Sequence, residues 1–236
     1  MSSKGISLRN GARAGHSILN SLSAETLKRI ERGGTRTTWQ KGQEIIRRSD
    51  DYDDVFILMS GLARVIVFSA TGKAVNFRRI DPGDIFGEFA AIDGDRRSAS
   101  VEAVEPCAVL SMSSSFFREM MQTDHAFMNA VLNHLVRQLR SMTARIVEFS
   151  TLAVTNRIHC ELLRMARSAR NGNGEYEITP APTHLEIAGR ISTHREAVSR
   201  EISRLKNLGI IERRGRALVV KDFPRLERMV HEASGE

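Results

Sequence analysis

The chain has 236 residues, a formal net charge of +7, 41% hydrophobic residues and 27% charged residues. A chain of this length buries the core of one large or two ordinary domains, and its composition excludes bulk disorder and collagen-like structure. No apolar run approaches the roughly eighteen residues of a membrane span, and the polar residues 1–20 show no signal peptide, so we expect a cytoplasmic protein that contacts no membrane.

The charge is unevenly spread along the chain. Residues 1–49 carry a net charge of +7, residues 50–155 of −4, and residues 156–236 of +4. A mildly acidic middle followed by a basic end indicates a polyanionic partner for the C-terminal part. A basic surface that is merely solvated explains the same charges, so charge alone leaves both interpretations open.

Short apolar runs separated by turn residues fill the chain from residue 37 to about residue 112. The runs lie at residues 55–59, 63–68, 75–77 and 108–110. Turn signals such as Ser60-Gly61 and Asp81-Pro82-Gly83-Asp84 separate them. Strands with turns at this spacing predict an antiparallel β-roll, barrel or sandwich.

A candidate anion site lies in this region, in the segments DIFGEFA (84–90) and RSA (97–99). A short helix beginning near Gly87 directs free N–H groups at an anion, Arg97 adds a guanidinium fork, and Ser98 adds a hydroxyl. Glu88 can accept a hydrogen bond from a ribose hydroxyl, so the set matches a nucleotide with one phosphate of low charge. An internal Glu88–Arg97 ion pair is the alternative. The candidate residues are Phe86, Gly87, Glu88, Phe89, Arg97, Ser98 and Ala99.

Helical periodicity becomes strong after residue 125. Apolar residues recur at alternating steps of four and three through three heptads, at Met128, Leu132, Leu135, Leu139, Met142, Ile146 and Phe149. A helix that packs only on its own domain shows a wider apolar stripe, so this narrow repeat favours a two-stranded coiled coil and a homodimer. A helix lying on the β-domain is the alternative.

Two helices joined by a tight turn are predicted after residue 182. Thr183 and Glu186 form a capping box, in which the hydroxyl and the carboxylate satisfy free backbone N–H groups at the start of the first helix. Ser192 stands at the turn, where a helix-turn-helix usually has Gly. The second helix starts near Arg195 and ends at Gly209. Its predicted buried stripe is Val198, Ile202, Leu205 and Leu208.

Two apolar runs around the basic turn 212–216 (ERRGR) predict a β-hairpin, the wing of a winged helix, whose arginines would lie along phosphates. Arg195, Glu196 and Arg200 lie near the start of the second helix. A helix inserted in the major groove presents such residues to base edges, where Arg binds guanine and Glu accepts from cytosine. The alternative is that Glu196 only caps the helix and both arginines are only solvated.

With these constellations in this order, the sequence resembles the CRP/FNR family of bacterial transcription regulators, and within it the members that respond to cyclic AMP. The resemblance covers about residues 37–220 and rests on PGDIFGE, RRSASVEA, the long helix, LAVTNRI and THLEIAGRISTHREAVSREISRL. It implies an α+β fold with five parts. These are a flexible extension (1–20), a cyclic-nucleotide-binding β-roll (21–125), a coiled-coil dimerisation helix (126–150), a hinge (151–155) and a winged helix-turn-helix domain (156–236).

The resemblance also implies roles for individual residues. Glu88 would hold the ribose 2′-hydroxyl and Arg97 with Ser98 the cyclic phosphate, while Gly87 and Ala99 present backbone groups. Met142 and Thr143 stand where the family contacts the base. Thr143 keeps a hydroxyl, but Met142 departs from the polar pattern, so cyclic AMP and cyclic GMP both remain open as the allosteric ligand.

On the DNA side, Arg195, Glu196 and Arg200 match the base-reading residues of the family and imply a palindromic operator with TGTGA-like half-sites. His194 stands where the family often has a Ser that contacts phosphate. The implied partners are a second copy of the chain, operator DNA and RNA polymerase. The expected DNA-binding residues are Thr183, Thr193, His194, Arg195, Glu196, Ser199, Arg200, Arg214 and Arg216.

Metal and haem sites find no support in the residues. An iron–sulfur cluster typically needs four cysteines, and the chain has only Cys107 and Cys160. No histidine lies between His16 and His125 to serve as an axial haem ligand, and the seven histidines form no zinc motif. We therefore expect no metal, no haem and no iron–sulfur cluster.

Two other functions remain as alternatives. A nucleotide-metabolising enzyme is remote because no triad or metal motif occurs, and the neighbours His159 and Cys160 point about 100° apart on a helix, so we expect no enzyme. The nearer alternative is a regulator of the same fold that binds DNA without a cyclic nucleotide or with another effector.

Overall fold

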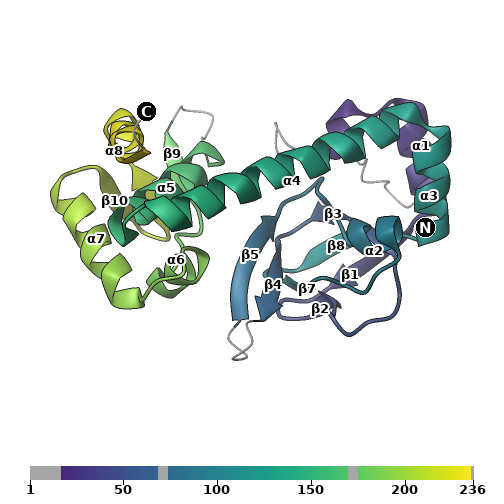
Figure 1. Cartoon of the computed structure of the whole chain (residues 1–236), viewed down its shortest axis with the longest axis horizontal. Coiled ribbons are helices and arrows are strands. Elements are labelled where there is room, and N and C mark those ends of the chain that lie inside the picture. The colour runs from purple at the N-terminus through teal and green to yellow at the C-terminus, as the bar shows by residue number, and fades with distance from the viewer. Residues whose placement is uncertain (1–16, 69–73, 170–174, 235–236) are drawn as a thin grey trace. The chain divides into compact units, whose positions relative to one another are not determined.

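The computed structural model describes residues 17–68, 74–169 and 175–234 (Figure 1). The chain forms two compact units, Met1–Leu139 and Arg140–Glu236. Residues 1–16, most of the predicted flexible extension, lie outside the described residues. The end of that predicted extension is instead part of the fold, because a 3-10 helix at Ile18–Ser21 buries Ile18 and Leu19 in the core.

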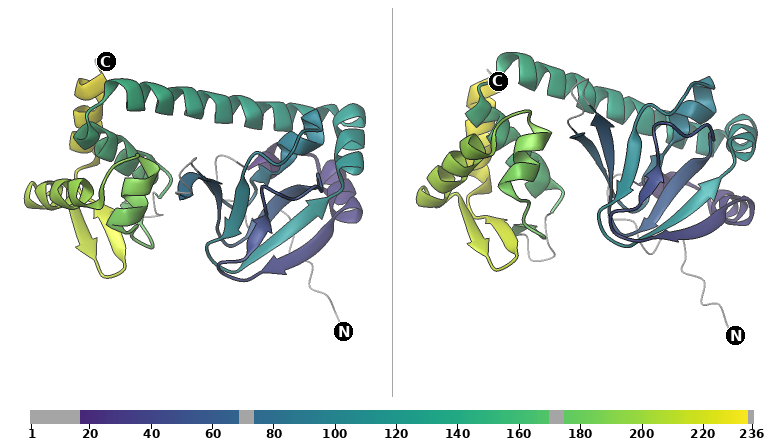
Figure 2. Two further views of the ribbon diagram at one scale, coloured as in Figure 1. Left: turned by 60° about the horizontal axis from the view of Figure 1, so that its bottom comes forward. Right: turned by 90° about the horizontal axis from the view of Figure 1, so that it is seen from below.

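Two four-stranded antiparallel sheets form the centre of the first unit (Figures 1 and 2). One sheet has the order β1-β8-β3-β6, with strands Thr35–Trp39, Cys107–Met112, Val55–Ser60 and Ile85–Phe86. The other has the order β2-β7-β4-β5, with strands Glu44–Ile46, Ser100–Ala103, Ala63–Phe68 and Ala74–Ile80. All four apolar runs identified in the sequence fall in these strands, so the prediction of an antiparallel β-roll is confirmed.

Strand β3 shows how its own sheet, β1-β8-β3-β6, is covered on both faces. Successive side chains of a strand point to opposite faces. Val55 and Ile57 pack in one core with helices α1 (Ala24–Gly33), α3 (Ser114–Thr123) and α4 (His125–Thr151). Phe56 and Leu58 pack in a second core between the sheets. A strand buried on both faces reads as a continuous apolar run, which is why VFILM shows no alternation.

Helix α4 has one buried face and one exposed face. Phe127, Ala130, Val131 and His134 are buried, and the first three pack against the β-domain core, as the alternative interpretation of the sequence expected. Of the predicted dimer seam, Leu135 packs partly against that same core and Met128 is half-buried. Of the remaining seam residues, Met142 is half-buried and the others are exposed, Leu139 to 65% and Ile146 to 66%. None of the helices that the structure describes is long and apolar enough to cross a membrane.

The second unit contains the rest of α4 and a small α+β domain. Helices α5 (Val154–Arg167), α6 (His184–Arg190), α7 (Arg195–Asn207) and α8 (Phe223–Ser234) pack around a three-stranded antiparallel sheet of order β10-β11-β9, formed by Ile211–Arg214, Ala217–Val220 and Tyr176–Ile178. The β10–β11 hairpin is the predicted wing. Strand β9 and helix α8 have no counterpart in the sequence prediction. Only Leu152 and Ala153 interrupt the path from α4 to α5, so this break is shorter than the predicted hinge at 151–155.

The tight turn between α6 and α7 places Ser192 in the left-handed region, with φ of 51°. This position explains why the turn usually carries Gly, which adopts positive φ without steric cost. Gly209, with φ of 69°, ends the second helix as expected. Val198, Ile202 and Leu205 are buried, but Leu208 is 39% exposed, so its assignment to the buried stripe is wrong. Leu208 follows the last helical residue, where the helical spacing no longer directs its side chain inward.

Candidate nucleotide site and nucleic-acid interface

Gly87 joins strand β6 to the short helix α2 (Glu88–Asp93). Its φ of 81° is left-handed, and a Cβ there would lie 2.9 Å from Arg97 Nη1 and 3.0 Å from the carbonyl oxygen of Asp54. Any side chain at this position would therefore be both strained and crowded. The backbone at Gly87 is thus held close to the Arg97 guanidinium.

Arg97 is buried, with 5% of its surface exposed. Its Nη1 donates to the carbonyl oxygen of Gly87 and its Nη2 to that of Asp54, each at 2.7 Å. The guanidinium carbon lies 5.0 Å from the ring centroid of Tyr52. Burial lowers the pKa of Arg97, and Tyr52 and the nearby aspartates partly offset that effect. The Phe56 ring centroid lies 5.9 Å from the guanidinium carbon, so two backbone carbonyls and two aromatic rings hold the guanidinium in place.

The Arg97 side chain still has unused hydrogen-bonding capacity. Its Nε is buried and has no hydrogen-bond partner among the described residues. A buried donor without a partner is costly, because the group has lost its water without gaining another acceptor. An anion beside Gly87 would supply that acceptor, so the residues present fit a bound phosphate.

Glu88 is buried at the start of α2 and does not pair with Arg97. Its Oε1 accepts a hydrogen bond of 3.1 Å from Nε2 of Gln138, a residue of α4. The same Gln138 nitrogen lies 2.6 Å from Nε2 of His134. Burial raises the pKa of Glu88, against the opposing effect of Arg78. The alternative of an internal Glu88–Arg97 ion pair is therefore wrong, and Glu88 instead joins α2 to α4.

His134 is neutral in this cluster. Burial, together with Arg78 and Arg137, lowers its pKa to about 3. Its Nε2 can therefore accept a hydrogen bond from Gln138, whose amide has one hydrogen for each neighbour. Sequence reasoning missed His134 and Gln138, although their spacing of four residues places both polar side chains on one face of α4.

The other residues predicted to bind the nucleotide differ in how deeply they are buried. Phe86 is buried and stacks on Phe56, with 5.4 Å between the ring centroids. Ser98 and Phe89 are exposed, and Ala99 is half-buried. Met142 and Thr143 belong to the second unit, and their contact with a nucleotide stays a prediction.

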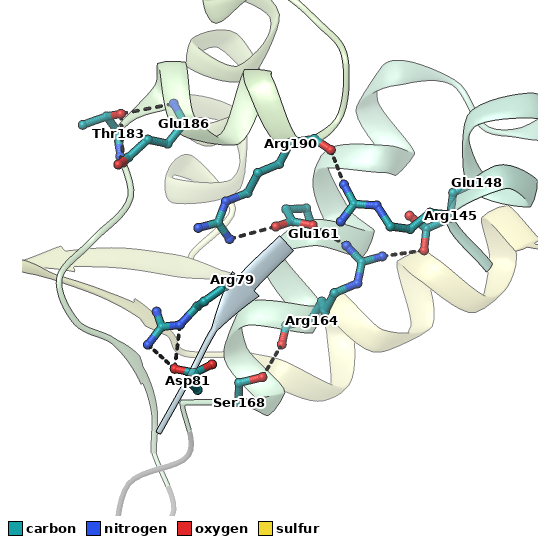
Figure 3. Close-up of polar contacts among 10 residues, drawn as sticks. All are labelled: Arg79, Asp81, Arg145, Glu148, Glu161, Arg164, Ser168, Thr183, Glu186 and Arg190. Carbon is teal, nitrogen blue, oxygen red and sulfur yellow. Dashed lines mark hydrogen bonds and ion pairs between the residues drawn. The ribbon is translucent and has the colours of Figure 1, made fainter. Parts of the chain in front are cut away.

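The capping box of the helix-turn-helix is formed as the sequence predicts (Figure 3). Thr183 Oγ1 accepts from the backbone N–H of Glu186 at 3.1 Å, and Glu186 Oε2 accepts from the backbone N–H of Thr183 at 2.7 Å. Ile187 and Ala188 of α6 are buried against the domain core. The start of α6 is thereby fixed relative to α7.

Three predicted base-reading side chains, Arg195, Glu196 and Arg200, are exposed at the start of α7. None of the ion pairs found within the described residues involves them. His194 occupies the N-cap position, and no side chain caps this helix, so Glu196 does not serve as a cap. His194 is exposed, while Thr193 and Ser199 are half-buried. The side chains predicted to read bases are therefore available to a ligand.

The wing presents three exposed arginines around Gly215, which has φ of 58°. Arg214 forms ion pairs with Glu212 at 3.2 Å and with Glu175 at 3.5 Å. Such exposed ion pairs contribute little to stability, so Arg214 can readily leave them for a phosphate. Arg213 and Arg216 form no ion pair within the part of the chain that the structure describes.

An open hollow of about 450 Å³ lies between α6, α7 and the wing, lined by Pro182, Thr183, His184, Leu185, Arg195 and Arg213. Burial, followed by the nearby cations Lys206, Arg195 and Arg213, lowers the pKa of His184. Sequence reasoning missed His184 and Lys206, whereas Arg213 belongs to the basic turn whose arginines were predicted to lie along phosphates. Two arginines that line the hollow, with Lys206 also near His184, make an environment suited to an anionic group. Across the described ranges, no three His, Cys, Asp or Glu side chains gather as a metal site would require.

Two protein-family models match the chain. A cyclic nucleotide-binding domain matches residues 36–124, and a Crp-like helix-turn-helix domain matches residues 156–229. The two models coincide with the two places where the candidate residues gather.

Individual proteins are similar to the chain over most of its length. The chain is 26% identical to the cAMP-activated global transcriptional regulator CRP of Pasteurella multocida over 177 residues, 75% of this chain and 85% of that protein. It is 28% identical to the transcriptional regulator LdrP of Thermus thermophilus over 186 residues, 79% of this chain and 92% of that protein. The c-di-GMP responsive global regulator CLP of Xanthomonas campestris shares the fold, with a TM-score of 0.71 at 19% identity, over 84% of this chain and 99% of that one.

Proposed function

This chain belongs to the CRP/FNR family of transcription regulators, which are not enzymes, and from this premise we propose a homodimer whose affinity for a palindromic operator depends on a bound cyclic nucleotide. The observation that carries the proposal is the buried Arg97 guanidinium beside Gly87, with its unpartnered Nε. The same chain carries exposed reading residues on α7. Its proposed parts are the β-roll, the dimer helix α4 and the winged domain.

In the proposed nucleotide site, Arg97 and Ser98 hold the cyclic phosphate, and Gly87 and Ala99 present backbone groups to it. Glu88 accepts from the ribose 2′-hydroxyl. Because Glu88 Oε1 already accepts from Gln138 of α4, a ribose at this carboxylate changes the hydrogen bonding between α2 and the dimer helix. This link is our proposed route from nucleotide to dimer. Phe86 and Phe89 flank the site, and Met142 and Thr143 of α4 contact the base.

On the DNA side, Arg195, Glu196 and Arg200 read base edges in the major groove. Phosphate contacts come from Thr183, Thr193, His194 and Ser199 around the turn, and from Arg214 and Arg216 on the wing. The hollow beside His184 and Arg213 adds a place for one backbone phosphate. RNA polymerase is the further proposed partner when the regulator is bound to its operator.

One observation favours a second candidate, the same regulator with a different anionic effector. Both terminal nitrogens of Arg97 already donate to backbone carbonyls. Fewer N–H groups are therefore left for a phosphate than a free guanidinium would offer. The structural relative CLP is described as responsive to cyclic di-GMP. Cyclic AMP, cyclic GMP and cyclic di-GMP are therefore the ligands to compare.

The proposal predicts that operator affinity rises about 5- to 150-fold when the effective nucleotide is added, the usual range of allosteric coupling. The measurement is fluorescence anisotropy of a labelled duplex that carries two inverted TGTGA half-sites with their centres one helical turn apart. Separate titrations contain cyclic AMP, cyclic GMP, cyclic di-GMP or no nucleotide. A response to cyclic di-GMP alone selects the second candidate. Equal affinities in all four titrations would refute nucleotide control.

A further inference from the structure

The last turns of α4 are tied to the helices that follow the break at Leu152 and Ala153 (Figure 3). Arg145 donates through Nη2 to the backbone carbonyl of Arg190, the last residue of α6. Glu148 Oε1 accepts from Nη2 of Arg164, on α5, at 2.6 Å. These two contacts cross the break without involving the residues at the break itself.

A buried carboxylate on α5 lies at the centre of this network. Glu161 is 2% exposed. Its Oε1 accepts from Arg190 Nη1 at 3.1 Å, and its Oε2 accepts from Arg164 Nη1. Burial would lower the pKa of Arg164, but the carboxylates of Glu161 and Glu148 outweigh it and raise that pKa. One guanidinium, that of Arg164, thus joins the end of α4 to the buried carboxylate.

An aromatic contact and a second buried pair extend these links. The Arg145 guanidinium lies 5.7 Å, and that of Arg157 on α5 lies 5.5 Å, from the ring centroid of Phe149 on α4. His159 Nε2 of α5 lies 2.6 Å from Glu201 Oε1 of α7, and both residues are buried. Helix α5 therefore contacts both the end of α4 and helix α7, which carries the predicted base-reading residues.

Arg190 connects this network to the helix-turn-helix. Arg190 ends α6, and its carbonyl is one of the groups that a helix C-terminus leaves without an intrahelical partner. Arg145 satisfies that carbonyl, two residues before the left-handed turn at Ser192 that leads into α7. The orientation of the turn is thus linked to a side chain of the dimer helix.

We propose that Arg145, Glu148 and Arg164 are positioning residues that fasten the DNA-reading domain to the last turns of α4, so that these turns and helices α5 to α7 move as one body. The break at Leu152 and Ala153 is then not the joint that the nucleotide moves. A change in the dimer helix is instead carried to α7 through side chains. The effect on coupling rests on the proposed function, whereas the rigid attachment does not.

The test changes only the α4 residues of the network, so that the contacts between α4 and the DNA-reading domain are lost while the domain itself stays folded. Glu161→Gln would leave two guanidinium groups around a buried amide and could prevent folding. The double variant Arg145→Gln, Glu148→Gln keeps the pairs of Glu161 with Arg164 and Arg190. The matched control is Arg167→Gln, which removes the Arg167–Glu227 ion pair of 2.7 Å, between α5 and α8 of the same domain.

The first readout is the coupling ratio, the operator Kd without nucleotide divided by the operator Kd with it. We expect the double variant to lower this ratio from the expected 5- to 150-fold to about twofold or less, because it removes both charge-assisted hydrogen bonds between α4 and the helices that follow. Nucleotide affinity in the absence of DNA should stay within about twofold, and the control should keep the wild-type ratio. A double variant with the wild-type ratio, or an equal fall in the control, would overturn the proposal.

The second readout needs no nucleotide. Leu152 donates its backbone N–H to the carbonyl of Glu148 at the end of α4, and Arg157 donates its own to the carbonyl of Ala153 at the start of α5, so one hydrogen bond lies on each side of the break. Hydrogen exchange of the Leu152 and Arg157 amides should be slow in the wild type and the control and clearly faster in the double variant, with α1 unchanged. If nucleotide does not change the operator affinity of the wild type, the proposed function is wrong. The exchange rates then test by themselves whether α4 is rigidly attached to the DNA-reading domain. Equal exchange in all three proteins would refute the attachment.

Discussion

Arg97→Ala is expected to lower nucleotide affinity by about 100-fold or more. Hydrogen bonds to a charged group contribute about 1.5–3 kcal/mol each, and the substitution removes the guanidinium that we place on the phosphate. Operator affinity measured without nucleotide should be unchanged. Calorimetric titration with cyclic AMP gives the affinity, and anisotropy with the labelled duplex gives the DNA binding.

The same substitution has a structural cost that must be separated from the loss of binding. Arg97 satisfies the carbonyls of Gly87 and Asp54, and each buried acceptor left unpaired costs about 1–3 kcal/mol. Arg97→Gln is therefore the second variant, because its amide can still donate to a carbonyl but carries no charge. Urea unfolding of both variants reports the stability. Nucleotide binding by a folded Arg97→Gln within about threefold of the wild type would show that Arg97 does not hold the phosphate.

Ile146→Asp is expected to dissociate the proposed homodimer. Ile146 lies on the predicted seam and is 66% exposed in the single chain. Burying such a side chain contributes about 1.5–3 kcal/mol, and a twofold axis doubles the loss, so the dimer dissociation constant should rise at least about 100-fold. Two carboxylates facing each other add repulsion. Sedimentation velocity over a concentration series measures the change.

Val147→Asp is the matched control for the seam. Val147 is the next residue on α4 and is also exposed, but it lies off the alternating repeat of four and three. It should remain a dimer with nearly wild-type affinity. Two variants that dissociate equally, or a dimeric Ile146→Asp, would contradict the placement of the seam.

Local patterns made the two candidate sites predictable. The capping box, the wing and the turn at Ser192 each depend on residues within a few positions of one another, and the structure forms all three. The glycine before Glu88 likewise marks the close approach of the backbone to Arg97. Short-range hydrogen bonding and steric limits on φ act before the rest of the chain is placed, so they can be identified from sequence.

Contacts between distant residues were not predictable from the same patterns. Glu88 and Gln138 lie fifty positions apart, and no periodicity connects them. Periodicity also does not say what covers an apolar position, so Leu135 was assigned wholly to a seam although it packs partly on its own core. The pairs of Glu161 and Arg164 join α4, α5 and α6, whose packing is decided by the whole domain. The fold class could be derived from sequence, but the polar links between its parts could not.

The most direct test of nucleotide control is reciprocity. If cyclic nucleotide tightens operator binding by some factor, operator must tighten nucleotide binding by that same factor. Calorimetric titration of cyclic AMP into the wild-type protein, alone and with saturating operator duplex, measures both constants. We predict a nucleotide Kd that is lower with operator by the factor found from anisotropy. Equal nucleotide affinities in the two titrations would contradict the account.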